Sequence, residues 1–302
     1  LPVLVPAYTS HVKTPAFAEV FTWLGSRFVK ITFSDQEVDP TIGIIVTMKI
    51  AILAPRHYVD ELKGYYSPPD GIVLHYFVEE SIREKDLKHV TDDLLSRKFD
   101  GYVGLVDWSS LYAAYLNRCI GAPSPSPTIL ARLQDKLLSR QIQSKHTGYR
   151  GLAKDTRTLK TSKQYDWPVF VKPRRGSMSY LSNVVDNFDE LEQGYGEDQR
   201  VNMRKVNQDW IKLYQLVGAP EEVKEGVDGF VAEGLLGNGV QVTLDGYVQN
   251  RRVGFFGFTK SVFMPNHISF KRFDYPYRFS HKLERRIKRH TKKFLKGSGF
   301  NH

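Results

Sequence analysis

The chain has 302 residues, 41% hydrophobic and 25% charged, a composition typical of a folded protein with two or three compact units rather than of a disordered one. No apolar run is long enough to span a bilayer and no basic leader with an apolar stretch opens the chain, so we expect no membrane partner and no secretory signal. The single cysteine, Cys119, excludes an internal disulfide and favours a cytoplasmic location, while the formal net charge of +10 favours an anionic ligand or partner.

The first half of the chain contains a run of alternating strands and helices that begins at Met48. Residues 1–47 show no visible chemistry, and we interpret them as an N-terminal extension. The expected strands are 49–54, 71–78 and 102–106, and the expected helices are 81–97 and a segment capped by Ser109 or Ser110 that runs to about Cys119. This alternation predicts a small parallel α/β sheet with right-handed crossovers. No GxGxxG motif follows the first strand, so a dinucleotide site is not supported.

Three prolines between Gly121 and Pro127 predict a stiff connector before the second half of the chain. A helix is then expected to restart at Thr128 and to carry Asp135 and Lys136. The later expected elements are a strand at 169–171 that ends in Lys172-Pro173, a loop at 174–179, a returning strand at 181–185, helices at 188–193 and 204–216, and strands at 230–233 and 240–244 joined by a turn at 237–239.

Much of the positive charge lies between residues 282 and 296. Leu283, Ile287, Phe294 and Leu295 recur there at helical spacing, which predicts an amphipathic helix with a solvated basic face. No aromatic-plus-basic strand or recognition-helix motif accompanies this helix, so we expect no nucleic-acid partner. The cluster also suits a smaller anion such as a nucleotide.

The loop after Lys172 is the most informative local feature. Gly176 permits close backbone approach, and the amides and hydroxyls around Ser177 and Ser179 can donate to phosphate oxygens. The loop is not a Walker motif, because the lysine there follows the glycines and opens a helix. Taken alone, a lysine followed by a basic turn also fits an ordinary exposed hairpin.

From about Met48 onward, three features in this order resemble the ATP-grasp superfamily. They are Gly121-x-Pro123 followed by Asp135-Lys136; Trp167-Pro-Val-Phe-Val-Lys172-Pro173 followed by Gly176 and Ser179; and Val231-Ala-Glu233-Gly-Leu-Leu236 followed by Gly239, Gln241-Val-Thr and Asp245-Gly246. Each piece is common, whereas the ordered set at these spacings is specific. Gln241-Val-Thr-Leu-Asp-Gly-Tyr and Ser269-Phe-Lys-Arg-Phe-Asp-Tyr-Pro further resemble a subgroup described as carboxylate–amine ligases.

The resemblance implies an α/β fold in several parts. A small parallel α/β pre-ATP-grasp domain is expected over 48–127, and a two-lobed α+β ATP-grasp domain follows it. Within the latter, 128–230 would hold the linker helix and the central ATP-binding lobe, and 231–302 would begin the C-terminal lobe. Superfamily members place a metal-binding glutamate and a Glu-x-Asn on strands after their final helix, and no such residues follow residue 296, so we expect the last part of the lobe to be missing from this sequence.

The resemblance also implies residue roles, with ATP and Mg²⁺ as cofactors. The expected nucleotide-binding residues are Lys136 and Lys172 for the phosphates, Gly176, Ser177 and Ser179 in the covering loop, Glu233, Gly234, Leu235 and Leu236 in the adenine hinge, and Gln241 where many members have a ribose-binding glutamate. The expected catalytic residues are Lys271, Arg272 and Arg278, for the γ-phosphate or a carboxylate, because such cations bind these anions well. Lys271 and Arg272 are adjacent, so in a strand only one of them would reach the site. The metal ligands stay unknown. Lys136 also fits a solvated helix lysine, and Glu233 an edge-strand acid.

The function implied is an ATP-dependent ligase that activates a carboxylate as an acyl phosphate and transfers it to an amine. The implied partners are small-molecule carboxylate and amine substrates, and a homodimer is left open as the assembly. Two alternatives are an ATP-grasp enzyme with another acceptor, such as bicarbonate or an enol hydroxyl, and a non-catalytic nucleotide-binding protein.

Overall fold

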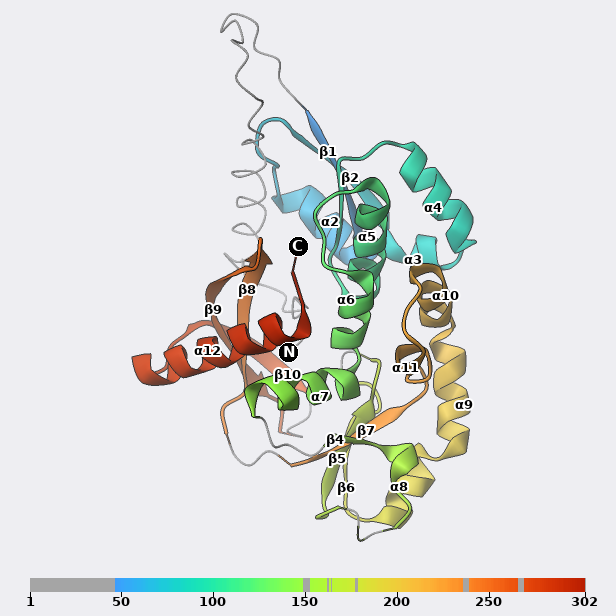
Figure 1. The fold of residues 1–302 in the computed structure, drawn as a ribbon, viewed down its shortest axis with the longest axis vertical. Helices are drawn as coiled ribbons and strands as arrows, with labels where there is room; N and C mark the ends of the chain where they lie inside the picture. Colours follow the sequence, from blue (N-terminus) through green and yellow to red (C-terminus); the bar gives the residue numbers. More distant parts are fainter. Residues whose placement is uncertain are drawn as a thin grey trace, which may run out of the picture. The chain divides into compact units, whose positions relative to one another are not determined.

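A computed structural model describes most of the chain from residue 47 onward (Figure 1). The described residues are 47–148, 153–161, 163, 165–176, 179–235, 239–265 and 269–301. They form two compact units, one over 47–123 and the other over 124–301. The predicted N-terminal extension, apart from residue 47, lies outside the described residues. No helix among these residues has the length and apolar character needed to cross a bilayer.

The N-terminal unit is built on a three-stranded parallel sheet of order β2-β1-β3, as the alternating pattern predicted. Its strands are β1 Met48–Ala54, β2 Ile72–Val78 and β3 Gly101–Gly104, and its helices are α2 Arg56–Tyr65, α3 Glu79–Arg83, α4 Leu87–Ser96 and α5 Asp107–Ile120. The central strand β1 is fully buried over its last four residues. Its apolar run therefore forms the middle of this unit's core.

Two details of this unit differ from the sequence prediction. The helix predicted over 81–97 is two helices, because the Asp86 side chain accepts the amide hydrogen of His89 at 2.8 Å and starts a new helix there. The cap predicted at Ser109 or Ser110 is wrong, because α5 already begins at Asp107. Inside the helix, the Ser109 hydroxyl accepts the amide hydrogen of Val106 at 3.3 Å.

The C-terminal unit begins with two helices, α6 Pro127–Gln134 and α7 Lys136–Thr147. The sequence predicted a single helix here. Asp135 breaks it, because its backbone is extended and its carboxylate accepts the amide hydrogens of Leu137 and Leu138, both at 3.0 Å. Lys136 is therefore the first residue of α7 rather than a residue inside a longer helix.

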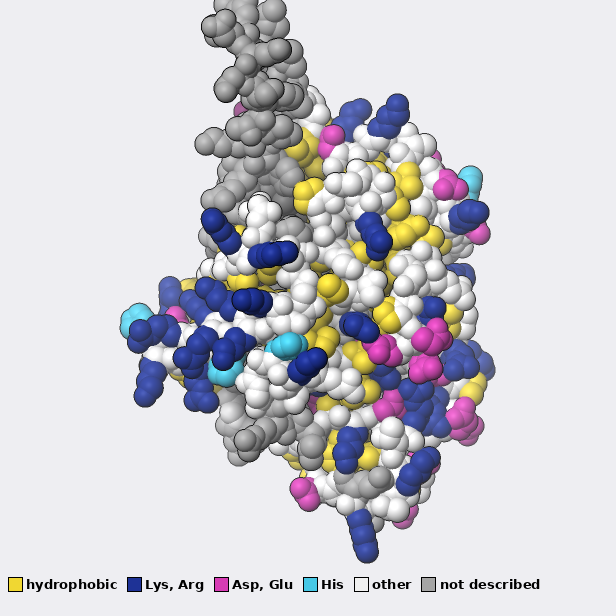
Figure 2. Space-filling model, in the orientation of Figure 1, with side chains coloured by type: hydrophobic (Ala, Val, Ile, Leu, Met, Phe, Trp, Pro, Cys, Tyr) yellow, Lys and Arg dark blue, Asp and Glu magenta, His cyan; other side chains and the backbone are white. Residues whose placement is uncertain are grey.

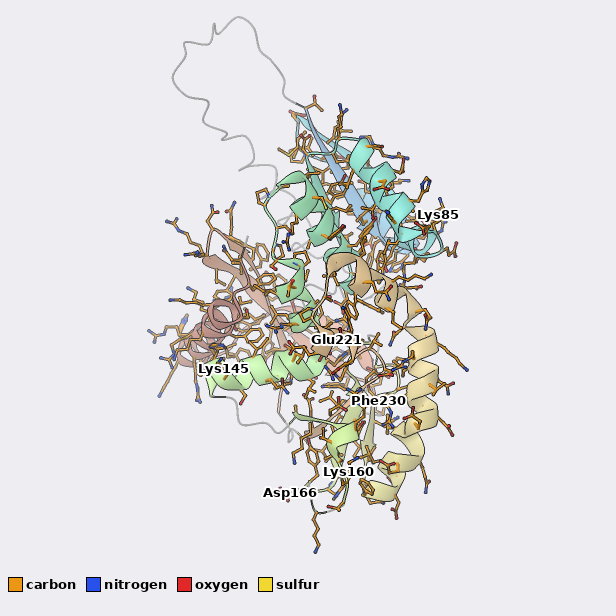
Figure 3. All side chains as sticks on the ribbon, turned by 45° about the vertical axis from the view of Figure 1, so that its right-hand side comes forward. Lys85, Lys145, Lys160, Asp166, Glu221 and Phe230 are labelled. Atoms are coloured by element: carbon orange, nitrogen blue, oxygen red, sulfur yellow. The ribbon has the colours of Figure 1, made fainter. Side chains whose placement is uncertain are left out.

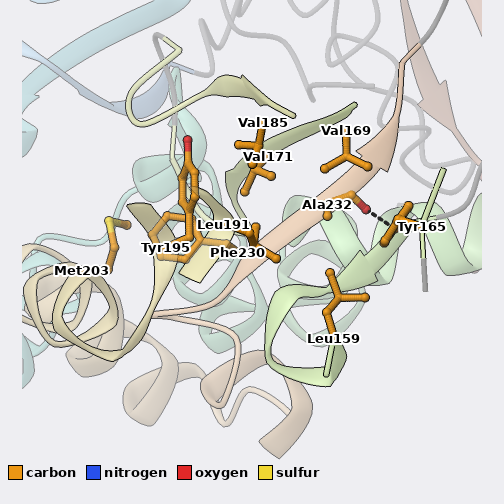
Figure 4. Packing of buried hydrophobic residues seen from close by; sticks show 10 residues of the cluster. All are labelled: Leu159, Tyr165, Val169, Val171, Val185, Leu191, Tyr195, Met203, Phe230 and Ala232. Carbon is orange, nitrogen blue, oxygen red and sulfur yellow. Dashed lines mark hydrogen bonds between the residues drawn. The ribbon is translucent and has the colours of Figure 1, made fainter. Parts of the chain in front are cut away.

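A four-stranded antiparallel sheet of order β4-β7-β5-β6 follows. Its strands are β4 Ala153–Asp155, β5 Val169–Pro173, β6 Asn183–Val185 and β7 Phe230–Gly234, and the remaining elements of this region are the 3₁₀ turn η1 Thr156–Thr158 and the helices α8 Phe188–Tyr195, α9 Glu197–Val206, α10 Gln208–Val217 and α11 Glu221–Lys224. The helix predicted over 204–216 is divided at Asn207 between α9 and α10. One face of the sheet packs Val171 and Ala232 against Leu191 of α8 and Met203 of α9 (Figure 4).

The last part of this unit is a three-stranded antiparallel sheet of order β10-β9-β8. Its strands are β8 Val242–Gln249, β9 Arg252–Phe263 and β10 Phe270–Tyr277, and the helix α12 His281–Ser298 follows them and lies beside α7 (Figure 1). The basic amphipathic helix predicted over 282–296 is confirmed. β7 and β8, predicted as neighbours across a turn, belong to different sheets, and part of the segment between them lies outside the described residues.

Candidate functional site

The polar face of the four-stranded sheet carries the two predicted residues Lys172 and Glu233. Side chains alternate along each strand, so the face opposite the core of Figure 4 presents Phe170 and Lys172 from β5, and Val231 and Glu233 from β7. The register pairs Phe170 with Glu233, and Lys172 with Val231. Lys172 and Glu233 are therefore diagonal neighbours, within reach of a long side chain.

Glu233 accepts from two cations at once. The Lys172 ammonium donates to its Oε2 atom, and the Arg140 guanidinium donates through Nε to its Oε1 atom at 2.7 Å. Arg140 projects from α7, so the cluster joins one helix to two strands; in Figure 3, Lys145 marks α7 and Phe230 marks β7. Arg140 was not among the residues predicted from the sequence. Its position four residues after Lys136, one helical turn onward, was the only signal available.

The three side chains are mostly buried, and their charges are interdependent. The side chain of Glu233 is 11% exposed, that of Lys172 15% and that of Arg140 24%. Burial lowers the pKa of Lys172, and the Glu233 carboxylate opposes that change. Burial alone would raise the pKa of Glu233, but the charges of Lys172 and Arg140 hold it below its ordinary value. The cluster is therefore one carboxylate shared by two cations, with an excess of positive charge.

The start of α7 is bound to the loop that follows β5. The Lys136 ammonium donates to the Gly176 carbonyl at 2.7 Å, and the Lys136 amide donates to the Arg174 carbonyl at 3.1 Å. The predicted phosphate lysine and the predicted covering-loop glycine are thus brought into direct contact. Ser179 follows in the same loop with a positive φ of 57°. Ser177 lies outside the described residues.

A buried ion network holds the base of this loop. The Arg174 guanidinium lies 2.9 Å from Asp135 Oδ2 through Nη2 and 2.9 Å from Asp155 Oδ2 through Nη1. It passes against Gly226 and Gly229, where an added Cβ would lie 2.5 Å and 2.8 Å from its atoms. Glycine is therefore required at both positions by the space that the guanidinium occupies.

The next residue, Arg175, is held by stacking rather than by charge pairing. Its side chain is 2% exposed, and its guanidinium carbon lies 3.7 Å from the centre of the Trp210 ring of α10. Its Nη2 donates to Gln134 Oε1 at 3.2 Å, whereas Nε and Nη1 have no hydrogen-bond acceptor within the part of the chain that the structure describes. The stack fixes the loop base against α10.

The predicted hinge residues lie at and beyond the end of β7. Gly234 ends the strand, and the Leu235 side chain, 48% exposed, follows it. Leu236 lies outside the described residues. Gln241 precedes β8, and its carbonyl accepts the amide hydrogen of Ser261 at 3.0 Å.

Gln241 and Lys271 line a common pocket at one end of the three-stranded sheet. Its volume is about 460 Å³. Its lining residues are Gly239, Val240, Gln241, Lys260, Ser261, Val262, Phe263, Met264, Pro265 and Lys271. The pocket combines apolar walls with two lysines, which suits a ligand with an apolar body and an anionic group.

The structure does not bring the two predicted arginines to this pocket. Arg272 lies on β10 with a half-exposed side chain, and its Nε donates to Asp274 at 2.8 Å. Arg278 is exposed beyond the end of β10. Of the three predicted catalytic cations, only Lys271 lines the pocket. Across the described ranges, no cluster of three or more His, Cys, Asp or Glu side chains could hold a metal ion, so the metal ligands stay unassigned.

Comparison with known proteins gives fold likenesses only. No protein-family model and no curated protein matches the sequence. Among solved structures, L-amino acid ligase from Bacillus licheniformis matches with a TM-score of 0.58 and 15% identity over 84% of this chain and 62% of that chain. N5-carboxyaminoimidazole synthetase from Staphylococcus aureus, complexed with ADP, matches with a TM-score of 0.54 and 16% identity over 83% of this chain and 63% of that chain. VanG D-Ala:D-Ser ligase from Enterococcus faecalis matches with a TM-score of 0.52 and 12% identity over 84% of each chain.

These likenesses show that the chain has the fold of ATP-grasp ligases, as the sequence resemblance implied. The mixed architecture, with one parallel and two antiparallel sheets, confirms the predicted fold class. The chain spans 62% and 63% of the first two of these structures.

Proposed function

We propose that the protein is an ATP-dependent ligase that joins a carboxylate to an amine. The observation that carries the proposal is that Lys136 contacts Gly176 in the loop that directly follows Lys172 at the end of β5. The fold's solved examples include ligases and an ADP complex. Lys136 and Lys172 would bind the nucleotide phosphates, and the loop from Gly176 to Ser179 would cover them. The hinge at Glu233, Gly234, Leu235 and Leu236 would hold the adenine, and Gln241 the ribose.

In the proposed reaction, a carboxylate oxygen of the substrate attacks the γ-phosphorus of ATP, and the bond to the leaving ADP breaks. The resulting acyl phosphate is attacked at its carbonyl carbon by the amine, which forms the amide and releases phosphate. Lys271, which lines the pocket, would neutralise charge on the transferring phosphoryl group or on the carboxylate. The covering loop would keep water from the acyl phosphate.

Mg²⁺ is part of the proposal, because a structurally similar protein, the biotin carboxylase domain of Hydrogenobacter thermophilus 2-oxoglutarate carboxylase, was solved with MgADP. When bound, it would neutralise phosphate charge. The described side chains offer no cluster that fits it, so no step is assigned to it. Another acceptor, such as bicarbonate, stays a second candidate, because the same biotin carboxylase domain was solved with a bicarbonate anion and matches with a TM-score of 0.54.

The test of the nucleotide site is ATP binding by Lys172→Ala. Loss of a charge-assisted contact costs about 1.5–3 kcal/mol, so the dissociation constant should rise roughly ten-fold or more. Lys154→Ala is the matched control, because Lys154 lies on β4 of the same sheet in register with Ala232 on the core face. Unchanged affinity in a correctly folded Lys172→Ala protein would defeat the assignment.

The reaction itself is tested by measuring ADP release, which should require both an acid and an amine. Tight ATP binding without such release, for every pair of acid and amine tried, would favour a non-catalytic nucleotide-binding protein.

A further inference from the structure

Arg140 is the least explained member of the charged cluster, because no role in the proposed reaction requires it. Its guanidinium is engaged with Glu233 at 2.7 Å and, through Nη1, with Gln143 of its own helix at 3.3 Å. One acceptor lies on β7 and the other on α7. The Arg140 side chain is therefore held between its own helix and the strand that carries Glu233.

The position of Lys172 raises a specific problem for phosphate binding. Its ammonium donates to Glu233, so a phosphate must compete with a carboxylate for the same charge. If Lys172 were the only partner of Glu233, its departure would leave a carboxylate with an 11% exposed side chain unpaired. Breaking a buried pair in that way is strongly unfavourable, because it leaves an uncompensated charge. That cost would oppose nucleotide binding.

We propose that Arg140 is a positioning residue that keeps Glu233 paired and so frees Lys172 to bind a phosphate group. The inference rests on the proposed function, because it assigns a phosphate to Lys172. Glu233 uses a different oxygen for each cation, Oε1 for Arg140 and Oε2 for Lys172, so one bond can break without the other. Arg140 supplies the permanent counter-charge and Lys172 the exchangeable one.

The proposal separates phosphate recognition from recognition of the base. Among the described residues, replacing Arg140 leaves Lys172 as the only cation paired with Glu233, which holds the ammonium on the carboxylate. Ligands whose phosphates need Lys172 then bind more weakly, whereas the affinity for a nucleoside without phosphates is unchanged. Residues in one charged network are energetically coupled, so we expect the ADP dissociation constant to rise roughly five-fold.

The experiment measures ADP and adenosine binding by calorimetry to the wild type, Arg140→Met, Arg140→Lys and the control Lys145→Met. Lys145 lies exposed on the same helix, so its replacement removes the same charge without touching Glu233 (Figure 3). Arg140→Met should weaken ADP and leave adenosine unchanged, Arg140→Lys should retain most of the ADP affinity, and Lys145→Met should match the wild type. Thermal unfolding of each variant identifies any that fails to fold, and Arg140→Gln replaces Arg140→Met in that case.

The decisive arm is a double-mutant cycle. In a Lys172→Ala background, Arg140→Met should have no further effect on ADP, because the exchangeable cation is already absent. Equal losses in both backgrounds, or an equal loss for adenosine, would overturn the inference while leaving the nucleotide site in place. ADP binding by wild type and Arg140→Met with the same dissociation constant would overturn it as well. A wild type that binds neither ADP nor ATP would overturn the proposed function and this inference together.

Discussion

Arg174 and Asp135 form a buried ion pair that ties the end of β5 to the beginning of α7. Their side chains are 5% and 0% exposed, and the Nη2 and Oδ2 atoms lie 2.9 Å apart. The same Asp135 carboxylate caps α7 through its Oδ1 atom. One side chain therefore positions both the helix that carries Lys136 and the strand that carries Lys172.

The two roles of Asp135 can be separated by two substitutions. Asp135→Asn keeps a good cap but removes the charge, and it should lower the free energy of unfolding by about 3 kcal/mol because a buried cation loses a partner. Asp135→Ala also removes the cap and should cost roughly 1 kcal/mol more. Urea unfolding measures both values. Equal losses in the two variants would show that the cap contributes nothing.

Acid should weaken the protein through Asp155. Burial alone would raise the pKa of Asp155, but hydrogen bonds and charge from Arg157, with a further bond from Arg174, hold it below its ordinary value of 3.8. A lowered folded-state pKa contributes stability that is present above the unfolded value and is lost as pH falls through about 4 and below. We expect Asp155→Asn to flatten the dependence of unfolding free energy on pH between pH 5 and 3. An unchanged slope would remove Asp155 from the acid response.

Replacement by alanine should change the stability of the protein in opposite directions at two glycines, because one is crowded by Arg174 and the other has open space. In Gly226→Ala, the new Cβ would meet the Arg174 guanidinium at 2.5 Å, so stability should fall by about 1–3 kcal/mol. In Gly194→Ala, on α8, the new Cβ meets nothing within 4 Å, and the higher helix propensity of alanine should raise stability by up to roughly 1 kcal/mol. Thermal unfolding of the two variants compares them directly. Stabilisation of both would contradict the close packing at Gly226.

The basic face of α12 should not bind nucleic acid tightly. Its exposed cations form one stripe at helical spacing (Figure 2) and are Lys282, Arg285, Arg286, Arg289, Lys292, Lys293 and Lys296. We expect no tight duplex binding at physiological salt, because a stripe of solvated charge without a reading motif gives only weak non-specific attraction. The measurement is a salt titration with duplex DNA. Tight binding with a steep salt slope, abolished by Arg285→Glu and Arg289→Glu, would reverse the prediction.

Lys271 and Arg272 should differ in their effect on turnover. Lys271 lines the pocket, whereas Arg272 pairs with Asp274, so Lys271→Ala should lower the turnover rate much more than it weakens ATP binding. Arg272→Ala should change both little. The turnover rate and the ATP dissociation constant of each variant are measured with a substrate pair that the wild type turns over. Normal turnover in both variants would make this segment structural.

The sequence predicted most strands and the order of the charged motifs, because strand periodicity and motif spacing are local properties. It missed the helix breaks at Asp86 and Asp135, because a polar residue within an amphipathic pattern does not reveal whether its side chain caps a new helix. It also missed the break at Asn207, whose side chain donates instead to the distant Val227 carbonyl.

The candidate site was predicted residue by residue but not pair by pair. Lys172 and Glu233 were both expected at the nucleotide, yet their mutual contact depends on the register of β5 and β7, which no local pattern specifies. Arg140 and the buried Arg174 were missed for the same reason, since their partners lie far along the chain. The two arginines placed with Lys271 from sequence are not at its pocket.

The strand order β4-β7-β5-β6 has a consequence for how the chain folds during synthesis. β7 lies between β4 and β5, although it is made after both and after the four helices that follow β6. Until Phe230 to Gly234 leave the ribosome, β4 and β5 present unpaired edges that can recruit other chains. Completion of the sheet is a late, long-range event, and loop-closure entropy slows such events. Glu233 arrives on that last strand, so the carboxylate that Arg140 and Lys172 share is absent from every nascent intermediate that precedes it.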